Sequence, residues 1–216
     1  MACDNISFAM TSLTEKQIDW IDECTGGTTW TLNPKTGLVD VDGDFYCGEQ
    51  LLTDFEGVKF GVVDRTFYCA DNWLKSLEGA PQSVGGDFYC SYNRLTSLVG
   101  APLKVGWSFY CENNRLTSLV GAPQEVGGSF NCEENSLTSL VGAPLKVERQ
   151  FYCDNNPVSQ KTLKAIFEKM QKGHSFLIAA ASLRNEMSEE DWKLIAPYIP
   201  EAIRPGVSML GRFGVI

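Results

Sequence analysis

The sequence predicts an α+β solenoid, in which short parallel strands stack along one axis and a different segment covers each end. Two observations predict this class: one pattern recurs through the middle of the chain, and helix signals appear only outside it. A phenylalanine two residues before a cysteine marks each copy, at Phe45, Phe67, Phe88, Phe109, Phe130 and Phe151. The interval of 21 or 22 residues corresponds to one supersecondary unit, which buries its apolar face only against its neighbours.

Residues 1–43 are predicted to form an N-terminal cap of one helix and one hairpin. Thr14 followed by Gln17 has the pattern of a capping box, and Gly26 with Gly27 ends the helical periodicity. These signals place a helix near residues 15–24. The stretches TTWTLN and GLVDVDGDF alternate in polarity on either side of residues 33–37, which predicts a β-hairpin leading into the first repeat.

Residues 44–156 contain six repeats, and the stretch DFYCSYN shows their phase. Phe88 and Cys90 are two residues apart and share one strand face, while Tyr89 points to the other face. Asn93 follows where the strand ends, and its amide can bond the backbone of neighbouring turns. The same offset holds Asn72, Asn114, Asn135 and Asn156, with Gln50 in the first unit.

The second half of each unit returns the chain to the core. Leu95 and Leu98 supply further apolar positions, a Gly-Ala-Pro turn follows, and Val105 points inward again. The first unit departs from this pattern, because QLLTDFEGVKFGVVDR carries one extra residue and lacks Ala-Pro. The sequence therefore does not determine the strand register of this first unit.

The pattern aromatic-x-Cys-x-x-Asn-x-Leu-x-x-Leu resembles the leucine-rich repeat, with phenylalanine and cysteine in place of two strand leucines. The spelling FYCxxNxLTSLxGAPxxVGG is similar to short leucine-rich repeats of bacterial and bacteriophage proteins, and the likeness covers residues 28 to 170. The resemblance implies a right-handed solenoid whose parallel strands line a concave, protein-binding face. It is more specific for fold than for activity.

Residues 157–216 are predicted to form a helical C-terminal cap. Ser159 can cap a helix that ends at Gly173, a second helix follows through SFLIAAASLRNEM, and Ser188 with three acidic residues after it begins a third. His174 is the only histidine of the chain. A Cys-His nucleophile is one interpretation, but a histidine at a helix end is also common for electrostatic reasons.

The formal net charge of −9 argues against a nucleic-acid partner, because binding to phosphates needs clustered Lys and Arg. A charged partner is expected to be a protein with a basic surface. The N-terminus MACDNISFAM has no basic region and no long apolar run, so neither an export signal nor a membrane segment is expected. The expected location is the cytoplasm, which for a phage-encoded protein is that of the host.

The cysteines are predicted to fill the core. The nearest two are 21 residues apart, unlike the close pairs of zinc sites, and side chains on stacked parallel strands do not point at each other as a disulfide requires. We expect reduced, buried thiols and no metal or cofactor. Calcium is an alternative for Asp40, Asp42 and Asp44, but the EF-hand pattern fails downstream. Acids that face outward from an early strand and discourage edge pairing explain them better.

The outward strand row is the main functional candidate. It holds Tyr46, Tyr68, Tyr89, Tyr110, Asn131 and Tyr152. At the usual strand spacing these six positions span about 24 Å. Tyrosine is enriched at binding hot spots, but it also favours strands and stacks across them, so a binding role and a purely structural role stay open.

The position after each cysteine is interpreted as a second outward row, formed by Gly48, Ala70, Ser91, Glu112, Glu133 and Asp154, with Glu134 beside it. Its last three members make an acidic end that suits a basic partner, with solubility as the competing explanation. Trp73 and Trp107 occupy slots that hold Arg or Gly in adjacent units, which predicts that both are exposed contact residues.

These features predict a non-enzymatic protein-interaction module with no catalytic residue. The family resemblance extends the prediction to a phage protein that binds and inhibits a host protein, for instance one of antiviral defence. Two alternatives remain open. One is a structural or self-assembling repeat protein, and the other is an enzyme or small-molecule binder with a site in the C-terminal helices around His174. The oligomeric state is also open.

Overall fold

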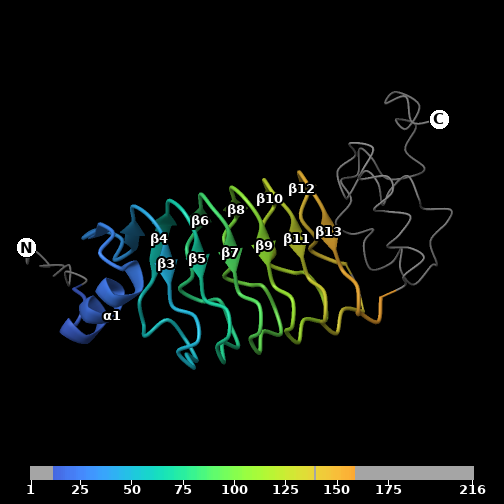
Figure 1. Cartoon of the computed structure of the whole chain (residues 1–216), viewed down its shortest axis with the longest axis horizontal. Helices are drawn as coiled ribbons and strands as arrows, with labels where there is room; N and C mark the ends of the chain where they lie inside the picture. Colours follow the sequence, from blue (N-terminus) through green and yellow to red (C-terminus); the bar gives the residue numbers. More distant parts are fainter. Residues whose placement is uncertain (1–11, 139, 159–216) are drawn as a thin grey trace, which may run out of the picture.

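The computed structural model describes residues 12–138 and 140–158, which form a β-solenoid with one helix at its N-terminal end (Figure 1). The helices predicted after residue 158, together with His174 and Cys3, lie outside the described residues. In the part of the chain that the structure describes, no helix is long and apolar enough to cross a membrane.

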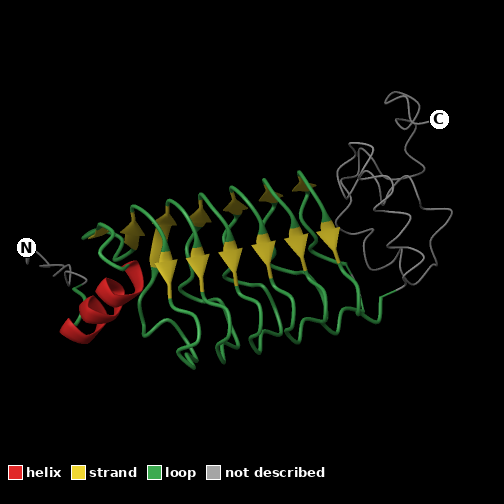
Figure 2. Cartoon of the chain, in the orientation of Figure 1, coloured by secondary structure: helices red, strands yellow, loops and turns green. Residues whose placement is uncertain are grey.

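The turns of the solenoid build two sheets (Figure 2). The tyrosine sheet consists of six parallel strands, β3 (Phe45–Tyr46), β5 (Phe67–Tyr68), β7 (Phe88–Tyr89), β9 (Phe109–Tyr110), β11 (Phe130–Asn131) and β13 (Phe151–Tyr152). Each residue faces its equivalent one turn away, such as Phe88 opposite Phe109. The predicted stack of parallel strands is confirmed.

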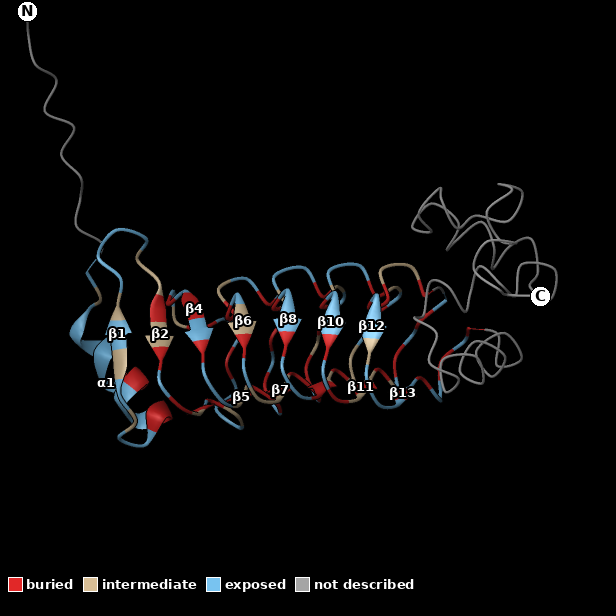
Figure 3. Ribbon diagram, turned by 90° about the horizontal axis from the view of Figure 1, so that it is seen from above, coloured by how far each residue is buried: buried red, intermediate tan, exposed pale blue. Residues whose placement is uncertain are grey.

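The valine sheet forms the other wall and does not follow from the sequence pattern. Its strands are β1 (Trp30–Leu32), β2 (Val39–Val41), β4 (Phe60–Val63), β6 (Ser83–Val84), β8 (Lys104–Val105), β10 (Glu125–Val126) and β12 (Lys146–Val147). Only β1 and β2 pair antiparallel, as the predicted hairpin requires. Each strand from β6 to β10 points one valine inward and one polar residue outward (Figure 3).

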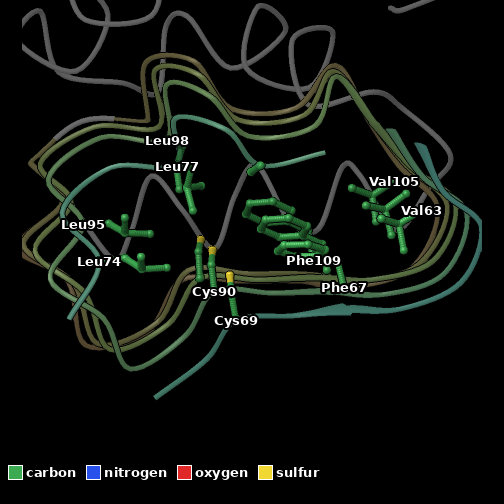
Figure 4. Close-up of a cluster of buried hydrophobic side chains, with 14 of the residues drawn as sticks. Val63, Phe67, Cys69, Leu74, Leu77, Cys90, Leu95, Leu98, Val105 and Phe109 are labelled. Carbon is green, nitrogen blue, oxygen red and sulfur yellow. The ribbon is translucent and has the colours of Figure 1, made fainter. Parts of the chain in front are cut away.

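The core fills the inside of the solenoid coil as rows of like residues (Figure 4). The rings of Phe88 and Phe109 stack with centroids 5.2 Å apart and planes 4° apart, and the rows of Cys, Leu and Val run beside them. Each fully buried phenylalanine contributes about 1.5–3 kcal/mol of transfer free energy. The phenylalanine row is therefore a main source of stability along the stack.

A ladder of asparagines closes the corner after each tyrosine-sheet strand. The Nδ2 of Asn93 donates to the carbonyls of Cys69 at 3.0 Å and Cys90 at 3.2 Å, and its Oδ1 accepts the N–H of Leu74 at 2.9 Å. Equivalent bonds are made by Asn72, Asn114, Asn135 and Asn156. Each asparagine thus ties its own turn to the preceding one, which confirms its predicted role.

The residue before each of these corner positions has a positive φ between 52° and 58°, namely Glu49, Asp71, Tyr92, Asn113, Glu134 and Asn155. This left-handed conformation is disfavoured for residues that carry a Cβ. The Gly-Ala-Pro turn also needs a positive φ, and at Gly100 a Cβ would lie only 2.6 Å from the carbonyl oxygen of Leu77. The first glycine of that turn therefore permits the close approach of two turns.

Helix α1 (Glu15–Thr25) confirms the predicted helix and its capping box at Thr14. Trp20 on its buried face meets the edge of Phe45, with ring centroids 5.4 Å apart. The indole Nε1 of Trp20 also donates to Oε1 of Gln50 at 2.9 Å. The first unit thus has glutamine where the later units have asparagine, and this longer side chain joins the helix to the stack.

The extra residue of the first unit is absorbed in strand β4. Val39 faces Phe60 but Val41 faces Val63, so β4 uses one residue more than β2 over the same span. The next pair is regular, with Val63 opposite Val84. The irregularity is therefore local and does not shift the register of later units.

The expectation that Asp40, Asp42 and Asp44 discourage edge pairing is wrong for Asp40, the member that lies within strand β2. Strand β2 lies between β1 and β4 and is not an edge. The Oδ1 of Asp40 accepts the N–H of Val62 at 2.7 Å, and the Oδ1 of Asp44 accepts the N–H of Thr66 at 2.8 Å. Two of these acids therefore satisfy backbone donors of the following turn.

Candidate interaction surface

The tyrosine row lies on the outer face of the tyrosine sheet and consists of Tyr46, Tyr68, Tyr89, Tyr110, Asn131 and Tyr152. The rings of Tyr89 and Tyr110 stack with centroids 4.5 Å apart and planes 8° apart, and Tyr68 follows 5.3 Å from Tyr89. The outward direction of the row is observed, and flat stacking is observed for Tyr89 with Tyr110, whereas the planes of the Tyr46–Tyr68 and Tyr68–Tyr89 pairs are tilted by 41° and 42°. The surface is thus a rigid aromatic strip.

Stacking leaves the ends of the tyrosine row more open than its centre. Tyr46 is 52% exposed and Tyr152 is 42% exposed, whereas the three tyrosines between them are half-buried. Burial, with the nearby charge of Asp87, raises the pKa of Tyr89 to about 12. The hydroxyl of Tyr89 is thus protonated at neutral pH, as an unshifted tyrosine also is, and it is hydrogen-bonded to Tyr110.

The prediction that the position after each cysteine points outward is wrong for the early turns, because Ala70 and Ser91 are buried. The ring of Tyr68 lies over Gly48, where a Cβ would come 2.3 Å from its Cε1 atom. Because the strands pair in register, each later tyrosine is expected to lie over the residue that follows the cysteine of the preceding turn. A residue just after the strand is therefore covered by the aromatic ring of the next turn.

The acidic row, which we define as Glu112, Glu133 and Asp154, lies at the C-terminal half of this face. Glu112 and Glu133 are half-buried, while Asp154 and the adjoining Glu134 are exposed. Burial raises the pKa of Glu112 and of Glu133, and Asp154 adds to the effect at Glu133. Oε2 of Glu112 is buried without a hydrogen-bond partner.

The ion pairs among the described residues all lie elsewhere, between Lys16 and Glu56, Lys104 and Glu125, and Lys146 and Glu148. Like charges on adjacent parallel strands repel, and the acidic row contains no Lys or Arg that would offset the repulsion. The row therefore combines partly desolvated carboxyl groups with unbalanced negative charge.

Asn131 interrupts the tyrosine row above these acids. Its Oδ1 accepts the backbone N–H of Glu133 at 3.0 Å, so the amide turns back to the backbone at the place where a tyrosine ring stands in other turns. The acidic row thus lies beside Asn131, the one position of the tyrosine row that has no aromatic ring.

Both predicted tryptophans are exposed, Trp73 at 43% and Trp107 at 56%. Each has an arginine over its ring, Arg94 at 4.6 Å from the Trp73 centroid and Arg149 at 5.6 Å from that of Trp107. Trp73 follows the asparagine corner, whereas Trp107 precedes strand β9. The fold therefore places them at opposite ends of the tyrosine-sheet strands and does not bring them together.

Tyr92 and Leu51 are among the exposed apolar residues that the sequence interpretation does not identify. Tyr92 is 54% exposed beside Asn93, and Leu51 is 59% exposed in the slot equivalent to Trp73. The signal for Tyr92 is present in the repeat, since the other units hold Asp, Asn or Glu at its position. A tyrosine in a polar slot indicates exposure.

No chemical centre stands out in residues 12–138 and 140–158. They contain no group of three His, Cys, Asp or Glu side chains that could hold a metal ion. The described cysteines are free and buried, as predicted, at positions 24, 47, 69, 90, 111, 132 and 153. An open hollow of about 360 Å³ lies beside Gly79, lined by Lys59, Glu78 and Val99 among others. Ser76 also lines this hollow, but its Oγ accepts the backbone N–H of Glu78 at 3.0 Å, and among the described residues no side-chain base is hydrogen-bonded to it.

Comparison with protein-family models, with curated proteins and with solved structures finds no match to this chain. Arguments about function therefore rest on the geometry of this surface.

Proposed function

We propose that the chain is a non-enzymatic protein-interaction module that binds a partner with a basic surface through the tyrosine row and the acidic row. The observation that carries the proposal is the stack of Glu112, Glu133 and Asp154 on successive turns without a cation of the described residues beside them. Lys or Arg side chains of a partner would neutralise the row and offset its repulsion. Such a contact would also supply a hydrogen-bond donor to Glu112.

The tyrosine row supports the same proposal through its shape and rigidity. Stacked rings such as Tyr89 and Tyr110 lose little conformational freedom on binding, because the fold already orders them. They present apolar area with a polar edge, which is typical of binding hot spots. The charge and the aromatic surface therefore complement each other on one face.

The resemblance to leucine-rich repeats of bacterial and bacteriophage proteins narrows the proposal. It favours a leucine-rich repeat solenoid with capped ends, and the contact of Trp20 in helix α1 with Phe45 supports a cap at the N-terminal end. It also favours a host protein as the partner, which the chain would inhibit by covering a basic surface.

The test compares two variants with the same change of charge. In the first, E112Q, E133Q and D154N neutralise the acidic row. In the matched control, D64N, E78Q and E125Q neutralise three exposed acids outside the tyrosine sheet. Affinity capture from the native host lysate, at low and high salt, should recover a basic protein with the wild type and the control but not with the first variant.

An equal loss of recovery by both variants, relative to the wild type, would show that net charge, and not this face, attracts the partner. Recovery that is unaffected by salt would likewise contradict an electrostatic interface, because salt screens exposed charges. Circular dichroism of both variants controls for folding.

A further inference from the structure

A second surface with the opposite charge lies at the corner after the tyrosine-sheet strands. The backbone N–H of Arg94 donates to the carbonyl of Leu74 and that of Arg115 donates to Leu95, one turn further on. The two arginines therefore occupy the same slot on adjacent turns, with Cα atoms about 4.8 Å apart. Trp73 fills this slot on the turn before Arg94.

The arginines of this slot have unused hydrogen-bonding capacity. Stacking over Trp73 engages the flat face of the Arg94 guanidinium, at 4.6 Å from the ring centroid, and leaves its in-plane N–H donors free. Among the described residues, no ion pair or side-chain hydrogen bond engages Arg94 or Arg115, and Lys75 beside them is also unpaired. The nearby Asp71 instead accepts a hydrogen bond from the Tyr68 hydroxyl at 3.3 Å.

Exposed apolar side chains lie on the same corner, with Tyr92 two residues before Arg94 and Leu51 on the turn before Trp73. Tyr92 and Leu51 are exposed and have φ values of 52° and 61°, a conformation that is unfavourable for both residue types. The φ of Tyr92 belongs to the corner of every turn, whereas the positive φ of Leu51 is not shared by Trp73, Arg94 or Arg115 in the same slot. The corner thus combines two oriented guanidinium groups with an exposed apolar border.

We propose that this corner, formed by Leu51, Trp73, Tyr92, Arg94 and Arg115, binds an acidic protein segment. A carboxylate of the segment lies between the two guanidinium groups, which match its geometry by bidentate hydrogen bonds. An apolar side chain next to that carboxylate covers Tyr92 and the free face of Trp73.

A peptide carboxylate suits this site better than a nucleic acid. The chain carries a net charge of −9, which repels a polyanion along its whole length. At physiological salt this field is screened beyond about 8 Å, so a short acidic segment experiences mainly the local arginines. The site shares no residue with the acidic row, although the two adjoin where the N–H of Tyr92 donates to the carbonyl of Glu112 at 3.1 Å, and the proposal stands or fails independently of the function proposed above.

The test measures fluorescence anisotropy of a labelled peptide in which Asp and Leu alternate, titrated with the full chain. The variants R94Q and R115Q should each weaken binding at least about tenfold, the effect of losing one charge-assisted hydrogen bond. R149Q is the matched control, because it removes an arginine that also lies over a tryptophan, at Trp107. It should leave the affinity unchanged.

Three further measurements decide the chemistry. A peptide with Asn in place of Asp should not bind, and a phosphoserine peptide should bind no tighter than the Asp peptide. The E112Q/E133Q/D154N variant should bind the Asp peptide at least as well as the wild type. The proposal is overturned if R94Q and R115Q bind normally, if R149Q loses as much affinity as they do, or if only the phosphoserine peptide binds.

Discussion

Asn113 and Asn114 are adjacent in the sequence and serve different purposes. Asn113 has a φ of 55° and makes no side-chain hydrogen bond within the described residues, whereas Asn114 donates to the carbonyls of Cys90 and Cys111 and accepts the N–H of Leu95. Asn113 therefore matters through its backbone conformation, whereas Asn114 matters through the hydrogen bonds of its side-chain amide. The positive φ recurs before each corner and the amide role recurs at Asn72, Asn93, Asn135 and Asn156, but Asp71 and Asn155 also make side-chain hydrogen bonds.

Glycine substitutions at these two positions should therefore have opposite consequences. N113G should leave stability unchanged or raise it, because glycine adopts a positive φ freely. N114G should cost about 2–4 kcal/mol, since it strands buried donors and acceptors of two turns. Urea denaturation of both variants measures the difference, and equal stabilities would refute this assignment of roles.

Glu112 should make stability depend on pH in a defined direction. Burial raises its pKa in the fold above the unfolded value, so the folded protein binds this proton more tightly. This contribution to stability is present below the ordinary pKa of 4.5 and is lost as the pH rises through the folded pKa.

The variant E112Q should therefore be more stable than the wild type at pH 7, and the advantage should shrink as the pH falls toward 4.5, the ordinary value for this group. Thermal unfolding across this range measures it. E78Q, which changes an exposed acid, is the control and should show no such trend. A pH-independent difference for E112Q would contradict the argument.

At the scale of elements, most strands have only two residues and would not form alone. Their conformation is maintained by pairing with the same residues one turn away and by the rows of side chains beneath them. The cysteine row shows this well. The Sγ of Cys69 donates to the carbonyl of Tyr89 at 3.2 Å, and Cys111 and Cys132 donate in the same way to Asn131 and Tyr152, so these thiols bond the backbone of the next turn and do not form a bridge.

The thiols of the cysteine row should not react with thiol reagents in the native protein. Burial raises the pKa of Cys69, Cys90 and Cys111 well above the usual value and that of Cys24 to about 11, so thiolate is scarce at pH 8. A thiol reagent at pH 8, followed by peptide mass spectrometry, should leave the described cysteines unmodified until denaturant is added. Rapid native labelling of Cys90 would contradict the observed burial.

The same shifts predict loss of stability in alkali. A thiol with a raised pKa in the fold contributes fully below the unfolded pKa of about 8.5, and the contribution declines as the pH rises through the folded value. Urea midpoints should therefore fall above about pH 8.5. A C90A variant should show a shallower fall than the wild type.

At the scale of the whole molecule, each turn contacts mainly its neighbours, so stability is a sum of local terms along the stack. The irregular first turn is covered by helix α1, and the Trp20 contact with Phe45 closes the apolar row at that end. The interaction surface runs across several turns and therefore depends on the stack staying continuous.

Truncation in the middle of the stack should test this view. The ring of Phe109 lies between those of Phe88 and Phe130, at 5.2 Å and 5.3 Å, and F109A should cost about 3–5 kcal/mol. Hydrogen exchange should rise most in strands β7, β9 and β11 and least in β3. A uniform rise along the chain would show that the stack unfolds only as one unit.

Part of this surface could be predicted from the repeat. The direction of Tyr89, the role of Asn93 and the exposure of Trp73 follow from alternation and from the residue types that share each slot. The burial of Ser91 and the use of Asp44 as a backbone acceptor do not follow, because each depends on a contact with the next turn.

The sequence by itself determined the period, the inward residues of each turn, the asparagine corners and the helix that covers the first turn. These features are local or exactly periodic, so spacing and residue type are enough to specify them. Only the tertiary structure decided which polar positions are covered, that a second sheet of valine strands exists, and that Arg94 lies over Trp73. The physical reason is that burial in a solenoid is set by the side chain one turn away, which lies far along the chain but about 4.8 Å away in space.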